Sequence, residues 1–233
     1  MSSITVTGSS DGITVAPAMD TIAAAKALAD TSPAALYGKT VTAVFPDCAY
    51  VQERHGQGVR IVTGQSISLN DVVDLAGTMT GSDKEKQLAA DTVVRKTTGG
   101  IGPVAFPGEW LGGHAFQYDP VAQTGQQEVR AYTAGVLSEL SSINNVGMLV
   151  TVLGRVTYSD TNGFYVDDGS GFSDFAQSGP DYPTGIKVTV PSGVATPAGG
   201  SYVVVTGISS VYQAGGSLRR LLLVRQQSDI VTF

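Results

Sequence analysis

Residues 149–171, LVTVLGRVTYSDTNGFYVDDGSG, have the pattern of a β-hairpin. Side chains alternate between the two faces of a strand, so the face that includes Val150 is expected to include Tyr158 as well. The Asn-Gly dipeptide at 162–163 is the pair that most easily forms a tight hairpin turn. The returning strand at 164–166 is aromatic and β-branched, as strands favour. This hairpin is the unit from which the rest of the chain is interpreted.

A second, less well matched copy of the hairpin begins at residue 39, and the strands after it also repeat. Self-similarity of this kind indicates a duplicated structural unit, so we expect two domains of one fold. The matched segments are 26–30 with 136–139, 41–42 with 150–151, 49–53 with 164–168, 58–62 with 185–189, and 72–77 with 202–207.

The composition favours an all-β protein. The chain has 233 residues, 29 of them glycine, and only 15% are charged, which is well below the usual quarter. That length is enough for two modest domains with hydrophobic cores of their own. The formal net charge of −6 works against general attraction to nucleic-acid phosphates, so nucleic acid is an unfavoured partner.

Four segments follow from the positions of the turns. They are a β-prone arm at 1–19, a first domain at 20–96, an ordered insert rich in Gly, Pro and aromatic residues at 97–135, and a second domain at 136–233. Short helices are expected at 22–29 and 135–140. Strands are expected at 39–45, 49–53, 58–62, 72–79 and 88–95, and then at 149–158, 164–166, 186–190, 202–212 and 218–225.

The second domain resembles tandem OB-fold proteins of the bacterial secreted or cell-surface type. The resemblance lies in NNVGMLVTVLGRVT, FYVDDGSG, VVVTGISS and RRLLLV, and less closely in GKTVTAVF, AYVQER, GVRIV, LGGHAFQYDP and TGQQ of the preceding residues. It implies two five-stranded Greek-key barrels in tandem and an extracellular or cell-surface location. It implies no particular activity, because OB folds bind oligonucleotides, oligosaccharides and proteins alike. The chain starts without a recognisable secretion signal and has no apolar run long enough for a membrane helix.

The OB fold directs attention to the face of its second and third strands, where ligands usually bind. Aromatic and basic residues that suit such a face are Tyr50, Arg54 and Arg60 in the first domain, and Tyr165 and Lys187 in the second. Because Phe164 and Tyr165 are neighbours in a strand, one of the two rings must be in the core.

Metal binding and catalysis have little support in the sequence. Asp167, Asp168 and Asp174 suit calcium chemically but lack the spacing of a calcium loop, so a solvated turn is the favoured interpretation. No other cofactor is expected. The two histidines are far apart and no serine lies in a nucleophile-elbow pattern. The single cysteine, Cys48, forms no disulfide within the chain and is interpreted as a strand thiol. We therefore expect a protein that is not an enzyme.

The N-terminal arm gives the leading functional hypothesis. Ile4, Val6, Ile13 and Val15 suit short strands that need an edge to pair with. If the arm pairs with the next copy, head-to-tail contacts build a filament, so the leading hypothesis is a structural subunit of an extracellular homopolymer. An arm folded onto its own domain is the alternative. The aromatic residues expected to help at such an interface are Phe106, Trp110, Phe116 and Tyr118. The alternative function is a secreted module that binds oligosaccharides or, less favoured, single-stranded nucleic acid.

Overall fold

The computed structural model describes residues 5–7, 13–81, 84–177, 179 and 181–233, with the backbone alone at 5–7 and 13–15. Contacts divide the chain into two compact units. Unit 1 consists of Met1–Ile101 with Phe116–Gln127, and unit 2 of Gly102–Ala115 with Glu128–Phe233. The segment 97–135 is therefore divided between the two units.

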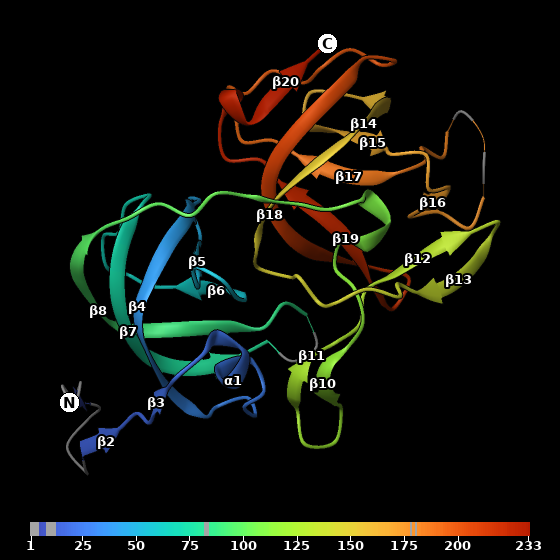
Figure 1. Ribbon diagram of the computed structural model, residues 1–233. Helices are drawn as coiled ribbons and strands as arrows, with labels where there is room; N and C mark the ends of the chain where they lie inside the picture. Colours follow the sequence, from blue (N-terminus) through green and yellow to red (C-terminus); the bar gives the residue numbers. More distant parts are fainter. Residues whose placement is uncertain (1–4, 8–12, 82–83, 178, 180) are drawn as a thin grey trace. The chain divides into compact units, whose positions relative to one another are not determined.

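Unit 1 contains a closed five-stranded barrel (Figure 1). Its strands are β4 (Pro33–Val44), β5 (Ala49–Gln52), β6 (Gly58–Val62), β7 (Asp71–Thr80) and β8 (Gln87–Thr98). They pair in the order β4-β5-β6-β8-β7, and β7 pairs with β4 to close the ring. All pairs are antiparallel except β6–β8, which is parallel. The expectation of an all-β chain with a closed five-stranded barrel is confirmed.

The other elements of unit 1 surround this barrel. They are β1 (Thr5–Thr7), β2 (Ile13–Val15), β3 (Ala18–Met19), helix α1 (Ile22–Lys26), β10 (Phe116–Asp119) and β11 (Thr124–Gln126). Strand β3 pairs in parallel with β4, and β10 pairs with β11 as a hairpin.

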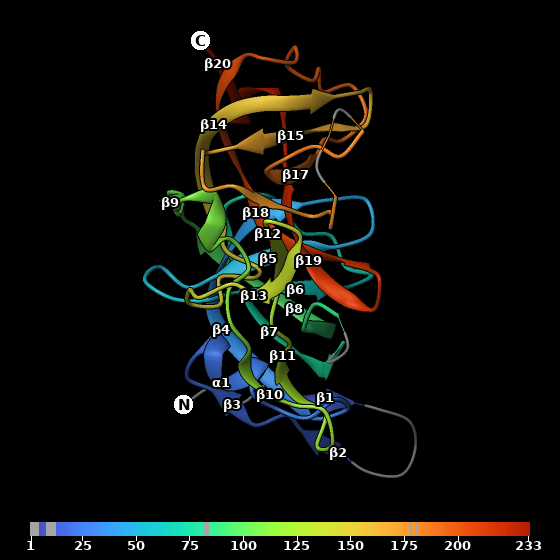
Figure 2. The same cartoon turned by 90° about the vertical axis from the view of Figure 1, so that its right-hand side faces the viewer.

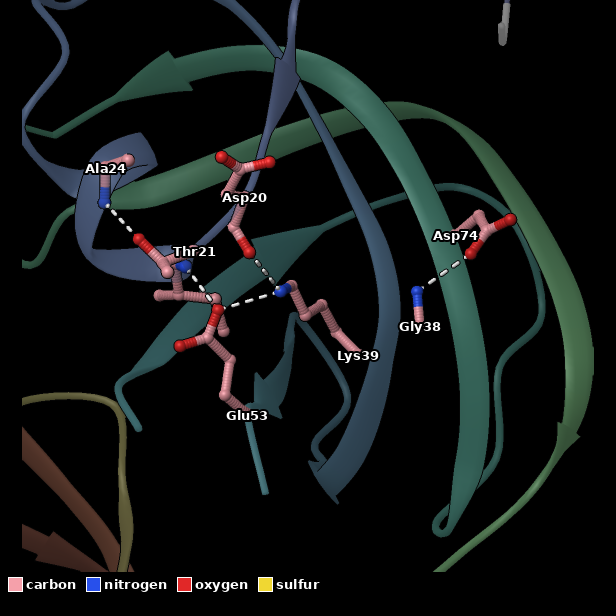
Figure 3. Close-up of polar contacts among 8 residues, drawn as sticks. Asp20, Thr21, Ala24, Gly38, Lys39, Glu53 and Asp74 are labelled. Atoms are coloured by element: carbon pink, nitrogen blue, oxygen red, sulfur yellow. Dashed lines mark hydrogen bonds and ion pairs between the residues drawn. The ribbon is translucent and has the colours of Figure 1, made fainter. Parts of the chain in front are cut away.

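Polar contacts attach α1 to the barrel (Figure 3). The Thr21 hydroxyl accepts a hydrogen bond from the Ala24 amide at 3.0 Å, the usual N-cap interaction. The Glu53 carboxylate accepts hydrogen bonds from the Ile22 amide at 2.6 Å and from the Lys39 ammonium at 2.7 Å. Because Lys39 lies on β4, this ion pair joins the start of the helix to the first barrel strand.

Unit 2 has the same order of strand pairings. Its strands β14 (Leu149–Ser159), β15 (Gly163–Asp167), β17 (Ile186–Thr189), β19 (Ser217–Leu223) and β18 (Tyr202–Ala214) pair in that order, and β18 also pairs with β14. The β17–β19 pair is the parallel one. Strands β9 (Val104–Ala105) and β20 (Ile230–Thr232) extend the sheet at β14 and β18.

A smaller sheet in unit 2 joins β12 (Arg130–Thr133) to β13 (Val136–Glu139) and β16 (Phe172–Ser173). Two short 3-10 helices complete the unit, η1 (Gly108–Trp110) and η2 (Gln227–Asp229). The expected helix at 135–140 is wrong, because residues 136–139 pair with β12 as a strand. Backbone pairing with a distant segment overrides a weak local helix preference.

The strand register shows which residues of the two units are equivalent. Strand β4 has a bulge between Val41 and Ala43, and β14 has one between Val156 and Tyr158. Val41 is thus equivalent to Val156, and the sequence match of 41–42 with 150–151 is wrong. The other three strand matches agree with the register, since β5, β6 and β7 are equivalent to β15, β17 and β18 at the residues expected.

Each unit has its own hydrophobic core inside the ring of strands. In each, a residue from the segment before the first strand contributes to the core, Ile22 in unit 1 and Leu111 in unit 2. Both side chains are fully buried. Core residues from the strands include Val41, Val51, Val59, Val73 and Leu75 in unit 1, and Val156, Val166, Ile186, Val203 and Val205 in unit 2.

Candidate ligand-binding face

Three side chains form a transverse row on the outer face of unit 2. Tyr158 of β14 lies directly opposite Tyr165 of β15, which lies opposite Lys187 of β17. Figure 2 shows these three strands side by side. Residues directly opposite each other share one face of a sheet. Because the neighbours of Tyr165, Phe164 and Val166, are buried in the core, the row faces away from it.

A β-bulge places Tyr158 in this row. Simple alternation predicts Tyr158 on the same side as Val156, which is 1% exposed, yet Tyr158 is 43% exposed. The extra residue, Thr157, reverses the alternation, as bulges do when they reorient a side chain. The Thr157 hydroxyl donates a hydrogen bond to the Thr184 carbonyl at 2.6 Å. The expectation that Tyr158 shares the face of Val150 is therefore wrong.

Four aromatic rings, which we call the aromatic row, follow one another across this face. Ring centroids are 6.3 Å apart for Tyr158 and Tyr165, 6.0 Å for Tyr165 and Phe175, and 5.7 Å for Phe175 and Tyr182. The two ends are exposed and the middle is more buried, with Tyr182 at 37% and Tyr165 at 9% exposure. The aromatic row thus presents a ring to solvent at each end.

A cavity of about 280 Å³ opens beside the Tyr158 end of the aromatic row. The turn between β14 and β15 forms one wall, where Asp160 accepts hydrogen bonds from the amides of Asn162 at 2.7 Å and Gly163 at 3.1 Å. The cavity is lined by Tyr158, Asp160, Asn162, Gly163, Phe164, Tyr165, Lys187, Val188 and Thr189. Aromatic and aliphatic surface with a few polar groups is typical of small-ligand sites.

Charged groups lie on this face and beneath it. The Lys187 ammonium is 4.5 Å from the centre of the Tyr212 ring, a cation–π distance. Burial raises the pKa of Asp174 to about 6, and the nearby Arg220 and Arg219 guanidinium groups partly offset that effect. Burial likewise raises the pKa of Tyr165 to about 12.

The equivalent face of unit 1 is filled by the chain's own side chains. Tyr50 lies opposite Arg60, as Tyr165 lies opposite Lys187, but Tyr50 is only 1% exposed. Its hydroxyl donates a hydrogen bond to Glu85 at 2.8 Å, and Arg60 pairs with Asp47 at 2.8 Å. Ala43 stands where unit 2 has Tyr158. Tyr50 and Arg60 thus share one face of the sheet, where Tyr50 is buried and the partly exposed Arg60 is paired with Asp47.

Arg54 lies in the exposed turn after β5, outside the strand pair that carries Tyr50 and Arg60.

The four aromatic residues expected at an interface belong to different units. Phe106 packs against the core of unit 2, and Trp110 of the same unit is 46% exposed. In unit 1, the Phe116 ring is 5.8 Å from the Lys26 ammonium, and Tyr118 is partly exposed on the same hairpin. Phe106 and Phe116 therefore have roles within their own units.

The arm forms a hairpin of its own. Val6 of β1 lies opposite Thr14 of β2, between Ile13 and Val15, and the described strands form a two-stranded sheet. Ile4 lies outside the described residues. Beyond the hairpin the chain docks onto its own barrel, where Ala16 is buried and β3 pairs with β4.

The three aspartates considered for calcium do not converge. The Asp167 carboxylate accepts a hydrogen bond from the Gly169 amide at 2.9 Å, and the Asp168 carboxylate accepts one from the Ser170 amide at 3.1 Å. The Asp167 contact is a turn interaction, the alternative that the sequence favoured, whereas the Asp168 carboxylate also accepts a hydrogen bond from the Gly108 amide outside its own turn at 2.5 Å. Asp174 is buried behind the aromatic row instead. Within the described ranges, no three His, Cys, Asp or Glu side chains are grouped to hold one metal ion.

The sequence predicts Tyr165 and Lys187 in a ligand face but misses Tyr158, Phe175 and Tyr182. The bulge that turns Tyr158 outward leaves no local sequence signal. The other two rings come from the irregular segment between β16 and β17. The sequence feature that could indicate these two residues is an aromatic side chain in an irregular segment, the same feature that marks the 101–118 region.

No protein-family model matches this chain, and no curated protein is significantly similar to it. In the part of the chain that the structure describes, no helix has the length and apolar character needed to cross a membrane.

Proposed function

We propose that the protein is a tandem OB-fold module that binds oligosaccharides at the outer face of unit 2 without catalysing a reaction. The OB assignment rests on the order of pairings. In both units the first strand pairs with the second and fourth, and the third pairs in parallel with the fifth. This order suits a five-stranded Greek-key barrel. The sequence resemblance to secreted OB proteins supports an extracellular or cell-surface location.

The observation that carries the binding proposal is the exposed Tyr158 ring beside a cavity on the first three strands. The OB fold commonly binds ligands on this side of the barrel. A sugar ring has an apolar C–H face that stacks on a tyrosine, and hydroxyl groups that bond to carboxylates and amides. Asp160, Asn162 and Thr189 provide such polar groups in the cavity wall.

Single-stranded nucleic acid suits this site less well. Modules that bind single strands combine stacking rings with a positively charged groove. This chain has a net charge of −6, and the cavity lining contains one basic residue, Lys187, together with Asp160.

Calorimetric titration with a panel of oligosaccharides tests the proposal. We expect binding by the wild-type chain and about tenfold weaker binding by Tyr158→Ala, which corresponds to a loss of about 1.4 kcal/mol of stacking energy. Tyr202→Ala is the matched control, since Tyr202 is 58% exposed on β18 of the same unit but does not line the cavity. If no oligosaccharide binds, or if both variants behave alike, the proposal is wrong.

Self-assembly through the arm is the second candidate function. In the two-stranded sheet of β1 and β2, each strand pairs only with the other among the described residues, so each has one free edge. A free edge can pair with a strand of another copy. Such contacts would make the chain a subunit of a homopolymer.

Deletion of residues 1–15 tests assembly and keeps the docked Ala16 and β3. Electron microscopy and size-exclusion chromatography at rising concentration are expected to show polymers for the full chain only. Monomers at every concentration of the full chain, or polymers of the deleted form, would count against strand donation.

A further inference from the structure

Lys187 is the basic residue on the open face of unit 2. It lies on β17 opposite Tyr165 and lines the cavity. Its ammonium lies over the Tyr212 ring, and none of the ion pairs found among the described residues includes it. A partly buried ammonium outside these ion pairs is able to bind an anionic ligand group.

The acids near Lys187 are shared or engaged elsewhere. Asp174 is 5% exposed and interacts with the charges of Arg220 and Arg219 as well as that of Lys187. Arg220 has further acidic neighbours in Asp168 and Asp167. Asp160, also in the cavity wall, holds the turn through two backbone amides. The cavity lining therefore contains one cation, Lys187, and one carboxylate, Asp160, and no ion pair among the described residues joins them.

The separation of Tyr158 and Lys187 shows which parts of one ligand could contact both residues. Tyr158 and Lys187 are two strand spacings apart, on the order of 10 Å between their backbones. A disaccharide is of similar length. A sugar stacked on Tyr158 would thus place the acidic group of the same or the next sugar near Lys187.

We propose that the site selects acidic oligosaccharides, with a ring carboxylate of a uronic acid bound at Lys187 and a sugar ring stacked on Tyr158. This inference rests on the proposed oligosaccharide binding and adds the class of sugar. A lysine ammonium is a point charge that also accepts a sulfate group, so the experiment separates these two sources of negative charge.

The test uses the full chain and four probes in calorimetric titrations. They are a tetragalacturonate, its carboxyl-reduced neutral counterpart with the same backbone, a sulfated neutral tetrasaccharide and a short oligothymidylate. We expect the wild type to bind the uronate about tenfold more tightly than the neutral counterpart, because one charge-assisted contact distinguishes them. Raising the salt concentration should reduce that preference.

Two variants of Lys187 test whether its ammonium group causes the preference for the uronate. Lys187→Met is expected to weaken uronate binding about tenfold more than it weakens binding of the neutral counterpart, whereas Lys187→Arg should retain the preference. Because Lys187 lies over Tyr212, circular dichroism and thermal unfolding first establish that both variants fold.

Each of the other possible results rejects one stated part of the proposal. Equal binding of the uronate and its neutral counterpart, or loss of both in Lys187→Met, rejects the role of Lys187 but leaves oligosaccharide binding intact. Tighter binding of the sulfated probe than of the uronate rejects the carboxylate assignment. Binding of the oligothymidylate alone replaces the sugar with nucleic acid, and binding of none of the probes rejects the proposed function itself.

Discussion

Tyr165 lies directly opposite Lys187, on the outer face of unit 2. Tyr50 and Arg60 occupy the same register in unit 1, but there Glu85 binds the tyrosine hydroxyl and Asp47 binds the arginine. The two units thus share a tyrosine–cation pair and differ in what surrounds it. In unit 2 an exposed ring and a cavity lie beside the pair, with Asp160 in the cavity wall and Asp174 among the charges that act on Tyr165, and the proposed ligand is placed in that cavity.

Asp174→Asn is expected to flatten the pH dependence of stability. Burial raises the folded-state pKa of Asp174 from 3.8 to about 6. Between these values the folded chain binds one more proton than the unfolded chain, so the free energy of unfolding falls as pH rises from 4 to 6. The full difference is on the order of 3 kcal/mol. Urea unfolding from pH 4 to 7.5 measures it.

In these urea unfolding experiments the free energy of unfolding of the wild type should fall as pH rises from 4 to 6. That of Asp174→Asn should fall less, so this variant should be the more stable protein at pH 7. The exposed Asp181 supplies the control variant, Asp181→Asn. An unchanged slope in Asp174→Asn would show that the nearby arginines compensate the buried carboxylate fully.

Lys26→Met is expected to stabilise unit 1. The Lys26 side chain is fully buried at the end of α1, and burial lowers its pKa from 10.5 to about 8. Between pH 8 and 10.5 only the unfolded chain carries this proton, so stability rises with pH there, and below pH 8 the full cost of burying the charge remains. The variant removes a cost of about 3 kcal/mol but also loses the contact with Gln57 at 3.3 Å and the cation–π contact with Phe116.

We therefore expect the free energy of unfolding at pH 7 to increase by about 1–2 kcal/mol in Lys26→Met. Chemical denaturation at pH 7 and pH 10 measures it, with Lys84→Met as the variant of an exposed lysine. A loss of stability at pH 7 would show that the polar contacts of Lys26 outweigh its desolvation.

Cys48 lies between β4 and β5, so its assignment to a strand is wrong, and it is only partly buried. Its thiol is expected to react slowly with iodoacetamide. Burial raises its pKa from 9.0 to about 11, and the thiolate is the reactive form. At pH 7.5 the folded chain then holds about 100-fold less thiolate than an unfolded one. Mass spectrometry of the alkylated chain, with and without urea, gives the two rates, and equal rates would contradict the raised pKa.

The scaffold is predictable from sequence to a large extent, because alternation and the Asn-Gly turn are local signals. They give the β14–β15 hairpin and, through the repeat, the equivalent β5, β6 and β7. What depends on pairing between distant segments is missed. Residues 136–139 form a strand because β12 lies beside them, and Tyr158 faces outward because an extra residue enters β14. The sequence thus predicts part of the candidate site. Tyr165 and Lys187 follow from strand alternation, but their aromatic neighbours do not.

One pair of repeated glycines is explained by close approach of two strands. Gly77 of β7 and Gly207 of β18 are equivalent, and a Cβ atom on Gly77 would overlap the Ala89 carbonyl oxygen. A Cβ on Gly207 would lie 2.5 Å from the Leu223 carbonyl oxygen. In each unit the atom belongs to the fifth strand, so any side chain here would push the fourth and fifth strands apart.

Gly77→Ala and Gly207→Ala should each lower the free energy of unfolding by about 3 kcal/mol or more, because backbone atoms of a ladder cannot move aside without breaking hydrogen bonds. Gly199→Ala is the control, since a Cβ there meets nothing within 4 Å, and its effect should stay within about 0.5 kcal/mol. Urea unfolding of the three variants measures the differences. If the Gly77 and Gly207 variants match the control, the strands are not held at this distance and the glycines repeat for another reason.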